Sequence, residues 1–122
     1  MEKIKSSSLE DILIESAMEA GALLRKNAYN ISEISYKSEQ DPVTDLDKSA
    51  EKLIKKNISK YGQANFIGEE YGLEDFGAKR TYIIDPIDGT KSFVRREFLS
   101  SVSIGVEEEG KLIGGCVYDF MR

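Results

Sequence analysis

The feature that most constrains the fold is an apolar run that ends in the hexapeptide Asp85-Pro86-Ile87-Asp88-Gly89-Thr90. A buried strand is predicted for the preceding residues, Arg80-Thr81-Tyr82-Ile83-Ile84. Proline has no N–H for a sheet ladder, so regular pairing should stop at Pro86. The end of this strand should therefore present Asp85, followed closely by a second carboxylate, Asp88.

The residues after the proline supply further polar groups. The carbonyl of Ile87 is a third hard oxygen, and Gly89 lets the backbone approach a ligand closely. Thr90 could cap a short helix begun by residues 91–94, whose free N–H groups would favour an anion. The hexapeptide thus offers oxygen ligands for a cation and amides for a phosphate, although Asp-Pro and Asp-Gly are also common in turns.

Composition argues against several classes of function. The chain has 122 residues, which suits one domain, and a formal charge of -5, whereas nucleic-acid-binding proteins concentrate positive charge. No apolar run approaches membrane-spanning length, and no segment of signal-peptide type follows the N-terminus. A single cysteine, Cys116, fits a reducing compartment, so a cytoplasmic protein is expected. The absence of histidine leaves carboxylates, hydroxyls, lysines or a bound cation for any catalysis.

A core-covering helix is predicted over Leu9–Lys26. It would begin with the capping box Ser7-Ser8-Leu9-Glu10. Its apolar residues recur at helical spacing, and they are Leu9, Ile12, Leu13, Ala17, Ala20 and Leu24. The residues that follow are mixed, and Ile31–Tyr36 could form a short strand.

A second helix is predicted over Asp45–Tyr61, with Thr44 as its N-cap and Gly62 as its stop. Its apolar stripe consists of Ala50, Leu53, Ile54, Ile58 and Tyr61. Asp47 has two interpretations. It could complete the cap of this helix, or it could be aimed from the helix start at a nearby cation.

The remaining segments predict a mainly antiparallel sheet, so the fold class is α+β with two N-terminal helices packed on that sheet. A short strand over Asn65–Ile67 should end in Gly68-Glu69-Glu70, followed by a surface loop over Tyr71–Lys79. Apolar residues alternate from Val102 to Val106, and a strand over Lys111–Asp119 returns after a turn. These two strands should form an antiparallel hairpin.

Three blocks of the chain, in this order, resemble the inositol monophosphatase family of magnesium-dependent, lithium-sensitive-type sugar phosphatases. They are Val43-Thr44-x-x-Asp47, Phe66-Ile67-Gly68-Glu69-Glu70 and the hexapeptide from Asp85 to Thr90. The C-terminal hairpin extends the resemblance over nearly the whole chain. It implies the first half of the layered sugar-phosphatase α/β sandwich, with residues 1–122 as an N-terminal metal-binding domain and no C-terminal domain.

The resemblance also implies a metal-ligand set. Glu69 would bridge the catalytic metals, and Asp85 with the Ile87 carbonyl would bind the first metal. Asp85 and Asp88 would bind the second. Ligands that are all oxygen suit Mg²⁺, for which Mn²⁺ could substitute.

Further roles implied by the resemblance concern water and phosphate. Thr90 would help to orient and deprotonate the attacking water, with Asp47 as an outer carboxylate nearby. Asp88 and the amides of Gly89 and Thr90 would hold the substrate phosphate. Glu70 is better interpreted as a solvated carboxylate, or as one that supports the metal ligands. The implied reaction is hydrolysis of a small phosphate monoester by metal-activated water.

Departures from the family pattern keep the substrate and the activity open. Lys91-Ser92-Phe93 replaces the threonine-asparagine-phenylalanine that is common in inositol monophosphatases, and it also resembles relatives acting on histidinol phosphate or 3′-phosphonucleotides. The family's late tryptophan-aspartate block is missing. The chain could therefore be an enzyme fragment with low activity alone, or a non-catalytic remnant that binds metal or a partner. An unpaired sheet edge and an apolar face favour a homodimer or other self-association.

Overall fold

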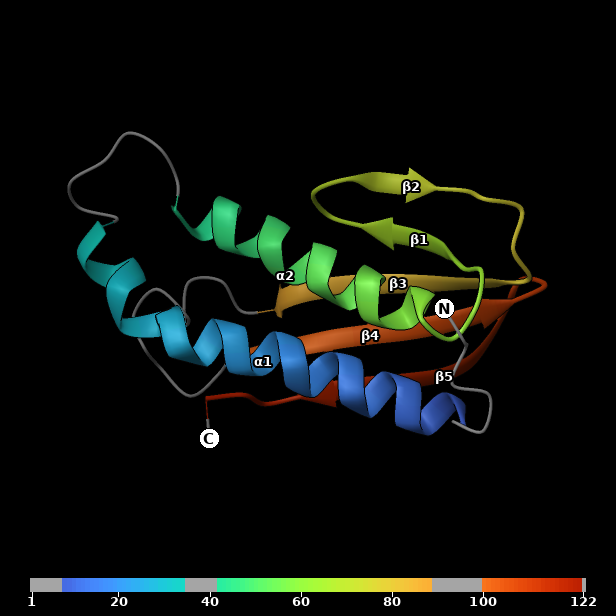
Figure 1. Ribbon diagram of the computed structural model, residues 1–122, viewed down its shortest axis with the longest axis horizontal. Helices are drawn as coiled ribbons and strands as arrows, with labels where there is room; N and C mark the ends of the chain where they lie inside the picture. The colour runs from blue at the N-terminus through green and yellow to red at the C-terminus, as the bar shows by residue number, and fades with distance from the viewer. Residues whose placement is uncertain (1–7, 35–41, 89–99, 122) are drawn as a thin grey trace.

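The computed structural model describes residues 8–34, 42–88 and 100–121, with the backbone alone for 28–34, 42–44 and 88. These residues form two helices on one face of a five-stranded sheet (Figure 1). The helices are α1 (Leu9–Ile34) and α2 (Pro42–Ser59). The strands are β1 (Asn65–Gly68), β2 (Gly72–Glu74), β3 (Arg80–Asp88), β4 (Ser101–Glu108) and β5 (Lys111–Tyr118). The predicted α+β class is confirmed.

Helix α1 begins at Leu9, as predicted, but Ser8 and Asp11 form its capping box in place of the predicted Ser7 and Glu10. The backbone N–H of Asp11 donates to Ser8 Oγ at 3.2 Å, and the N–H of Ser8 donates to Asp11 Oδ2 at 3.4 Å. The helix continues to Ile34, so the strand suggested for Ile31–Tyr36 is wrong over its first four residues. A helix satisfies its backbone groups locally, whereas a short strand needs a neighbour to pair with.

Helix α2 begins at Pro42, so Thr44 lies inside the helix and the prediction that it is the N-cap is wrong. Proline suits the first helical turn because the N–H that it lacks would have had no acceptor there. The helix ends at Ser59, two residues before the predicted Tyr61, and i→i+3 backbone hydrogen bonds continue the turn to Gly62, which has φ of 145°. This earlier start adds a turn of helix before Asp47.

The sheet has the strand order β2-β1-β3-β4-β5, with β1 parallel to β3 and every other pair antiparallel. Residues 72–74 form β2, which corrects the loop predicted over Tyr71–Lys79. Gly72 has φ of 65°, a conformation that glycine tolerates in the tight turn between β1 and β2. The β3–β4 register shifts between Asp85 and Asp88, around Pro86, but pairing resumes where Asp88 meets Ser101.

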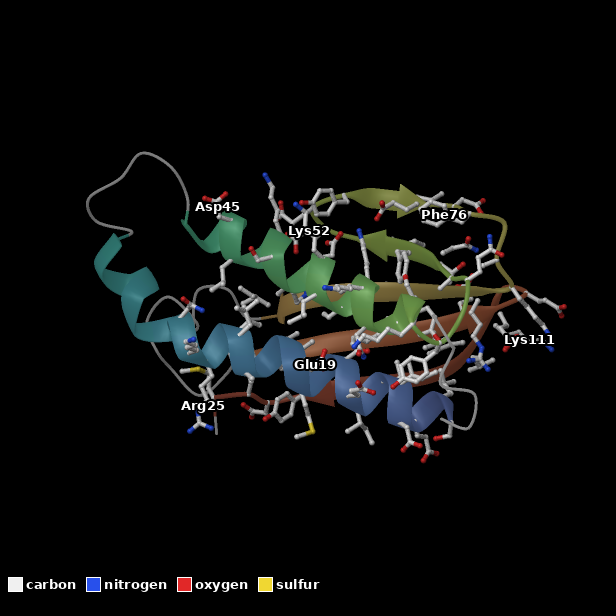
Figure 2. All side chains as sticks on the ribbon, viewed as in Figure 1. Glu19, Arg25, Asp45, Lys52, Phe76 and Lys111 are labelled. Atoms are coloured by element: carbon white, nitrogen blue, oxygen red, sulfur yellow. The ribbon has the colours of Figure 1, made fainter. Side chains whose placement is uncertain are left out.

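The core lies between the helices and the sheet, and both predicted helical stripes face it apart from Leu53, which is half-buried outside the core. Its buried apolar side chains include Leu13, Ala17, Leu24, Ala50, Ile54, Ile58, Phe66, Tyr82, Ile84, Val102, Ile104 and Val106. Within this core Asn57 Nδ2 donates to Ser16 Oγ at 2.7 Å, which joins the two helices. Charged side chains such as Arg25 and Asp45 project outward from the helices (Figure 2).

The opposite face of the sheet is left uncovered by the described residues. Register places Leu73 beside Ile67, and Ile67 beside Ile83. These side chains, with Leu112 and Val117, are between 38% and 72% exposed. In the described part of the chain, neither helix combines the length and apolar character needed to cross a membrane.

We expect Gly21→Ala to destabilise the protein, although alanine is the better helix former by about 1 kcal/mol. A Cβ at position 21 would overlap the Tyr118 ring and lie 2.9 Å from Phe120 Cβ. Such overpacking typically costs about 1–3 kcal/mol. Thermal unfolding should show a lower Tm for Gly21→Ala, with a smaller loss in a Tyr118→Ala background. A higher Tm in the native background would contradict this packing.

Candidate metal and phosphate site

The candidate site lies at one edge of the sheet, where the parallel pairing of β1 with β3 ends. Gly68 pairs with Ile84 across β1 and β3, so the next residues along the chain, Glu69 and Asp85, occupy neighbouring positions. The N-terminal half of α2 lies over this edge and carries Asp47 (Figure 1). Three separate segments therefore bring predicted site residues to the same edge.

The pKa of Asp47 is raised by burial and by nearby carboxylates. The side chain is buried, at 6% exposed, and its Oδ1 has no hydrogen-bond partner among the described residues. Burial, followed by the negative charges of Glu69, Glu70, Asp85 and Glu51, raises the pKa of Asp47 to about 7. Without a cation, this edge of the sheet concentrates more negative charge than it can stabilise.

The other predicted residues are placed less completely. Glu69 is exposed in the turn after β1, and Glu70 beside it is half-buried. Ile87 is buried in β3. Asp88 ends β3, but its side chain lies outside the described residues, as do Gly89 and Thr90. The phosphate cradle and the water-orienting hydroxyl therefore stay predictions.

The chemistry of the donors fits a hard cation. Each candidate ligand at this edge is a carboxylate or a carbonyl oxygen, and a cation would offset the mutual repulsion around Asp47. Over 8–34, 42–88 and 100–121, however, no three acidic or cysteine side chains are grouped closely enough to hold one ion. Asp88, the remaining predicted carboxylate ligand, is not among these side chains because only its backbone is described.

Sequence reasoning missed Glu51, which follows Asp47 by one helical turn. Glu51 is completely buried, and its Oε2 lies 2.6 Å from Lys55 Nζ. Burial alone would lower the pKa of Lys55, but hydrogen bonds to Glu51 and Glu74 outweigh burial and raise it. The signal was available: Glu51 immediately follows Ala50 and precedes Ile54 by three residues, so it falls within the apolar stripe of α2.

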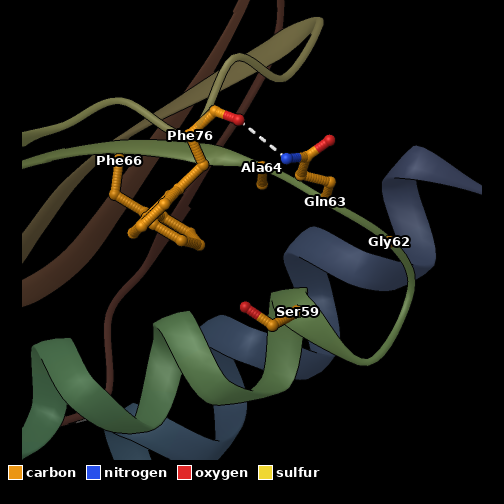
Figure 3. Close-up of a pocket in the computed structure, with 6 residues that line it drawn as sticks. All are labelled: Ser59, Gly62, Gln63, Ala64, Phe66 and Phe76. Atoms are coloured by element: carbon orange, nitrogen blue, oxygen red, sulfur yellow. Dashed lines mark hydrogen bonds between the residues drawn. The ribbon is translucent and has the colours of Figure 1, made fainter.

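The hollow at the opposite end of β1 differs in character from the acidic edge. Its volume is about 360 Å³, and its lining residues are Ser59, Gly62, Gln63, Ala64, Phe66 and Phe76 (Figure 3). Gln63 Nε2 donates to the Phe76 carbonyl at 2.7 Å across its rim. None of these lining residues is a carboxylate, so this pocket lacks the groups needed for metal chemistry.

We expect Asp47→Asn to stabilise the metal-free chain at pH 8 but not at pH 4. The folded-state pKa of about 7 exceeds the ordinary value of 3.8, so stability falls as pH rises between these values. Above pH 7 the ionised Asp47 lowers the free energy of unfolding by an amount on the order of 2–4 kcal/mol, and asparagine removes this penalty because it carries no charge. Chemical unfolding in chelator at both pH values tests this, with exposed Asp45→Asn as control. Equal effects of Asp47→Asn at both pH values would contradict it.

The sequence matches a known family over most of its length. A model of the inositol monophosphatase family matches residues 5–122. An inositol monophosphatase from Dictyostelium discoideum is 36% identical over 123 residues, which cover 97% of this chain and 45% of that protein. Nus factor SuhB of Escherichia coli strain K12 is 40% identical over 116 residues, which cover 92% of this chain and 43% of that protein.

The fold gives the same assignment. The crystal structure of the extragenic suppressor protein suhB from Bartonella henselae matches with a TM-score of 0.79 and 28% identity, covering 94% of this chain and 45% of that one. The chain thus spans less than half the length of these relatives. Sequence and fold agree over nearly all of the residues compared, and the chain belongs to the inositol monophosphatase family.

Proposed function

We propose that this chain forms the metal- and phosphate-binding part of a Mg²⁺-dependent phosphatase. The substrate would be a small phosphate monoester, with inositol monophosphate or a similar sugar phosphate favoured by the family. The observation that carries the proposal is the buried Asp47, whose pKa is raised by burial and by surrounding carboxylates that include Glu69 and Asp85. The cytoplasm is the proposed location, where the single thiol of Cys116 would stay reduced.

The proposed metal ligands are Glu69, Asp85, Asp88 and the Ile87 carbonyl, with Mn²⁺ able to replace Mg²⁺. When bound, such ions supply an activated water and neutralise the leaving oxygen of an in-line displacement. Carboxylates and carbonyls favour these hard cations over zinc. This assignment uses both acidic side chains of the hexapeptide and Glu69, the first residue after the neighbouring parallel strand.

The remaining roles belong to groups that touch water or substrate. Thr90 would orient the attacking water and help to deprotonate it, with Asp47 as the nearby carboxylate that finally accepts the proton. The amides of Gly89 and Thr90, beside Asp88, would hold the phosphate oxygens. Donors fixed before the reaction begins need no reorganisation as charge develops on the phosphoryl group.

A second candidate function is association with a partner through the uncovered sheet face. Its apolar side chains, Ile67, Leu73, Ile83, Leu112 and Val117, form a surface that soluble monomers seldom expose over several adjacent strands. Self-association as a dimer is proposed on this ground. For the proposed phosphatase, histidinol phosphate and 3′-phosphonucleotides are alternative substrates because of Lys91-Ser92-Phe93.

We expect the 122-residue chain to bind Mn²⁺, and Asp88→Asn to weaken that binding by about tenfold or more, since loss of even a residue that supports a metal ligand costs about 10–100-fold. Isothermal calorimetry on both forms measures the difference. Glu19→Gln, on the exposed side of α1, is the matched loss of one negative charge and should bind as the native chain does. No binding at millimolar Mn²⁺, or equal affinity in Asp88→Asn, would contradict the ligand assignment.

We expect Thr90→Ala to lower kcat by about 10²-fold with little change in KM, since the water would lose its positioned hydroxyl. The assay is phosphate release from inositol 1-phosphate with excess Mg²⁺. It should use residues 1–122 joined to the remaining segment of a full-length relative, because residues 1–122 alone should show only trace turnover. A near-native kcat in Thr90→Ala would contradict the water-orienting role and indicate that Thr90 serves only as a helix cap.

A further inference from the structure

The turn between β1 and β2 carries Glu69 and is joined to α2 by a buried carboxylate. The backbone N–H of Glu70 donates to Glu51 Oε1 at 3.3 Å. A Cβ added to Gly68 would overlap the Glu51 carboxyl group, so that group packs directly against the end of β1. Glu51 therefore contacts the residues on both sides of Glu69.

Lys55 holds this carboxylate in place from one helical turn away. Its Nζ lies 2.6 Å from Glu51 Oε2 and also bonds Glu74 on β2. The same ammonium lies 4.6 Å from the centre of the Tyr71 ring, within reach of a cation–π interaction. One cation thus connects α2 to the turn and to the strand that follows it.

The two carboxylate oxygens of Glu51 have different partners. Oε2 faces the ammonium of Lys55, and Oε1 accepts the hydrogen bond from the turn. A carboxylate that is completely buried is costly unless it is paired. Neutralisation by Lys55 therefore allows Glu51 to remain charged beside the turn, where a charged acceptor makes a stronger hydrogen bond than a neutral one.

Strand β2 depends on this attachment. It has three residues, of which Gly72 and Leu73 are exposed, and it forms an outer edge of the described sheet. A short, exposed edge strand fixes its turn poorly by itself. Bonds from a buried helix residue to the turn and from Lys55 to Glu74 supply the missing restraint.

We propose that Glu51, held by Lys55, is a positioning residue that aims Glu69 at the edge shared with Asp47 and Asp85. This inference rests on the proposed function, because Glu69 is a metal ligand only within it. Glu51 acts through the Gly68–Tyr71 turn and does not itself bind the metal. The same contact accounts for glycine at position 68, since the Glu51 carboxyl group occupies the space that a side chain would need.

The test compares Glu51→Ala, Glu51→Gln and Lys55→Met with the native 122-residue chain. Lys56→Met is the matched control, because Lys56 is exposed on the same helix. Mn²⁺ affinity is measured by calorimetry, and exchange of the Glu69, Glu70 and Tyr71 amides is measured by NMR without metal. Circular dichroism identifies any variant that does not fold.

Glu51→Ala should weaken Mn²⁺ binding by about 10–100-fold, the range found when a residue that orients a metal ligand is lost. Exchange in the turn should quicken by about tenfold, while amides in the core of α2 exchange as before. Glu51→Gln keeps an oxygen that can accept from Glu70, so it should lose less affinity and less protection than Glu51→Ala. Lys55→Met should follow Glu51→Ala in direction, and Lys56→Met should match the native chain.

Native Mn²⁺ affinity in a folded Glu51→Ala would overturn the inference, whether or not its turn exchanges faster. If both Glu51 variants fail to fold, Lys55→Met decides: native Mn²⁺ affinity in this variant would overturn the inference, whether or not its turn exchanges faster. If the native chain binds no Mn²⁺, the proposed function fails and the positioning of a metal ligand fails with it. That outcome differs from native-like binding by the variants, which contradicts this inference alone.

Discussion

The parallel pairing of β1 with β3 is the constraint on which the candidate site depends. The other described strand pairs are antiparallel, so the C-terminal ends of neighbouring strands meet at one edge only here. That edge receives Glu69 from one strand and Asp85 from the other. Helix α2 precedes β1 in the chain and its N-terminal half lies over the same edge (Figure 1), where Asp47 interacts electrostatically with Glu69 and Asp85.

Gathering carboxylates in this way opposes stability in the absence of a cation. The raised pKa of Asp47 expresses that cost, since protonation relieves part of the repulsion. Glu51 shows the contrasting arrangement, because its buried charge is neutralised by Lys55. Two carboxylates of one helix thus differ: Glu51 is paired within the protein, whereas Asp47 has the role proposed above, beside a site that a cation would complete.

The two faces of the sheet differ in whether their apolar side chains are covered. The face toward the helices is filled by alternating side chains such as Val102, Ile104 and Val106, while Leu73, Leu112 and Val117 on the other face are exposed. In the longer relatives, additional chain accompanies the matched segment. An apolar sheet face that stays uncovered is a ready surface for association, either with another copy or with another polypeptide.

Much of this structure could be predicted from local patterns in the sequence. Both helical stripes follow from the 3.6-residue period, and the β4–β5 hairpin follows from alternation. The predicted boundaries that proved wrong depend on neighbouring elements. Residues 31–34 are helical, and Gly72–Glu74 form a strand because they pair with β1. Neither outcome is encoded in a short window, because each depends on what lies beside it.

The sequence by itself determined the α+β class, the family resemblance and the set of carboxylates, because residue type and spacing carry that information. Tertiary structure decided which of them meet. The parallel register makes Glu69 and Asp85 follow the last β1–β3 pair at the same edge, and the packing of α2 buries Glu51 against Gly68. The position of Glu51 in the apolar stripe of α2 indicates burial, but its i,i+4 spacing from Lys55 is the same as that of a solvated helix pair. Only its burial under the β1–β2 turn gives it a structural role, since burial makes pairing obligatory.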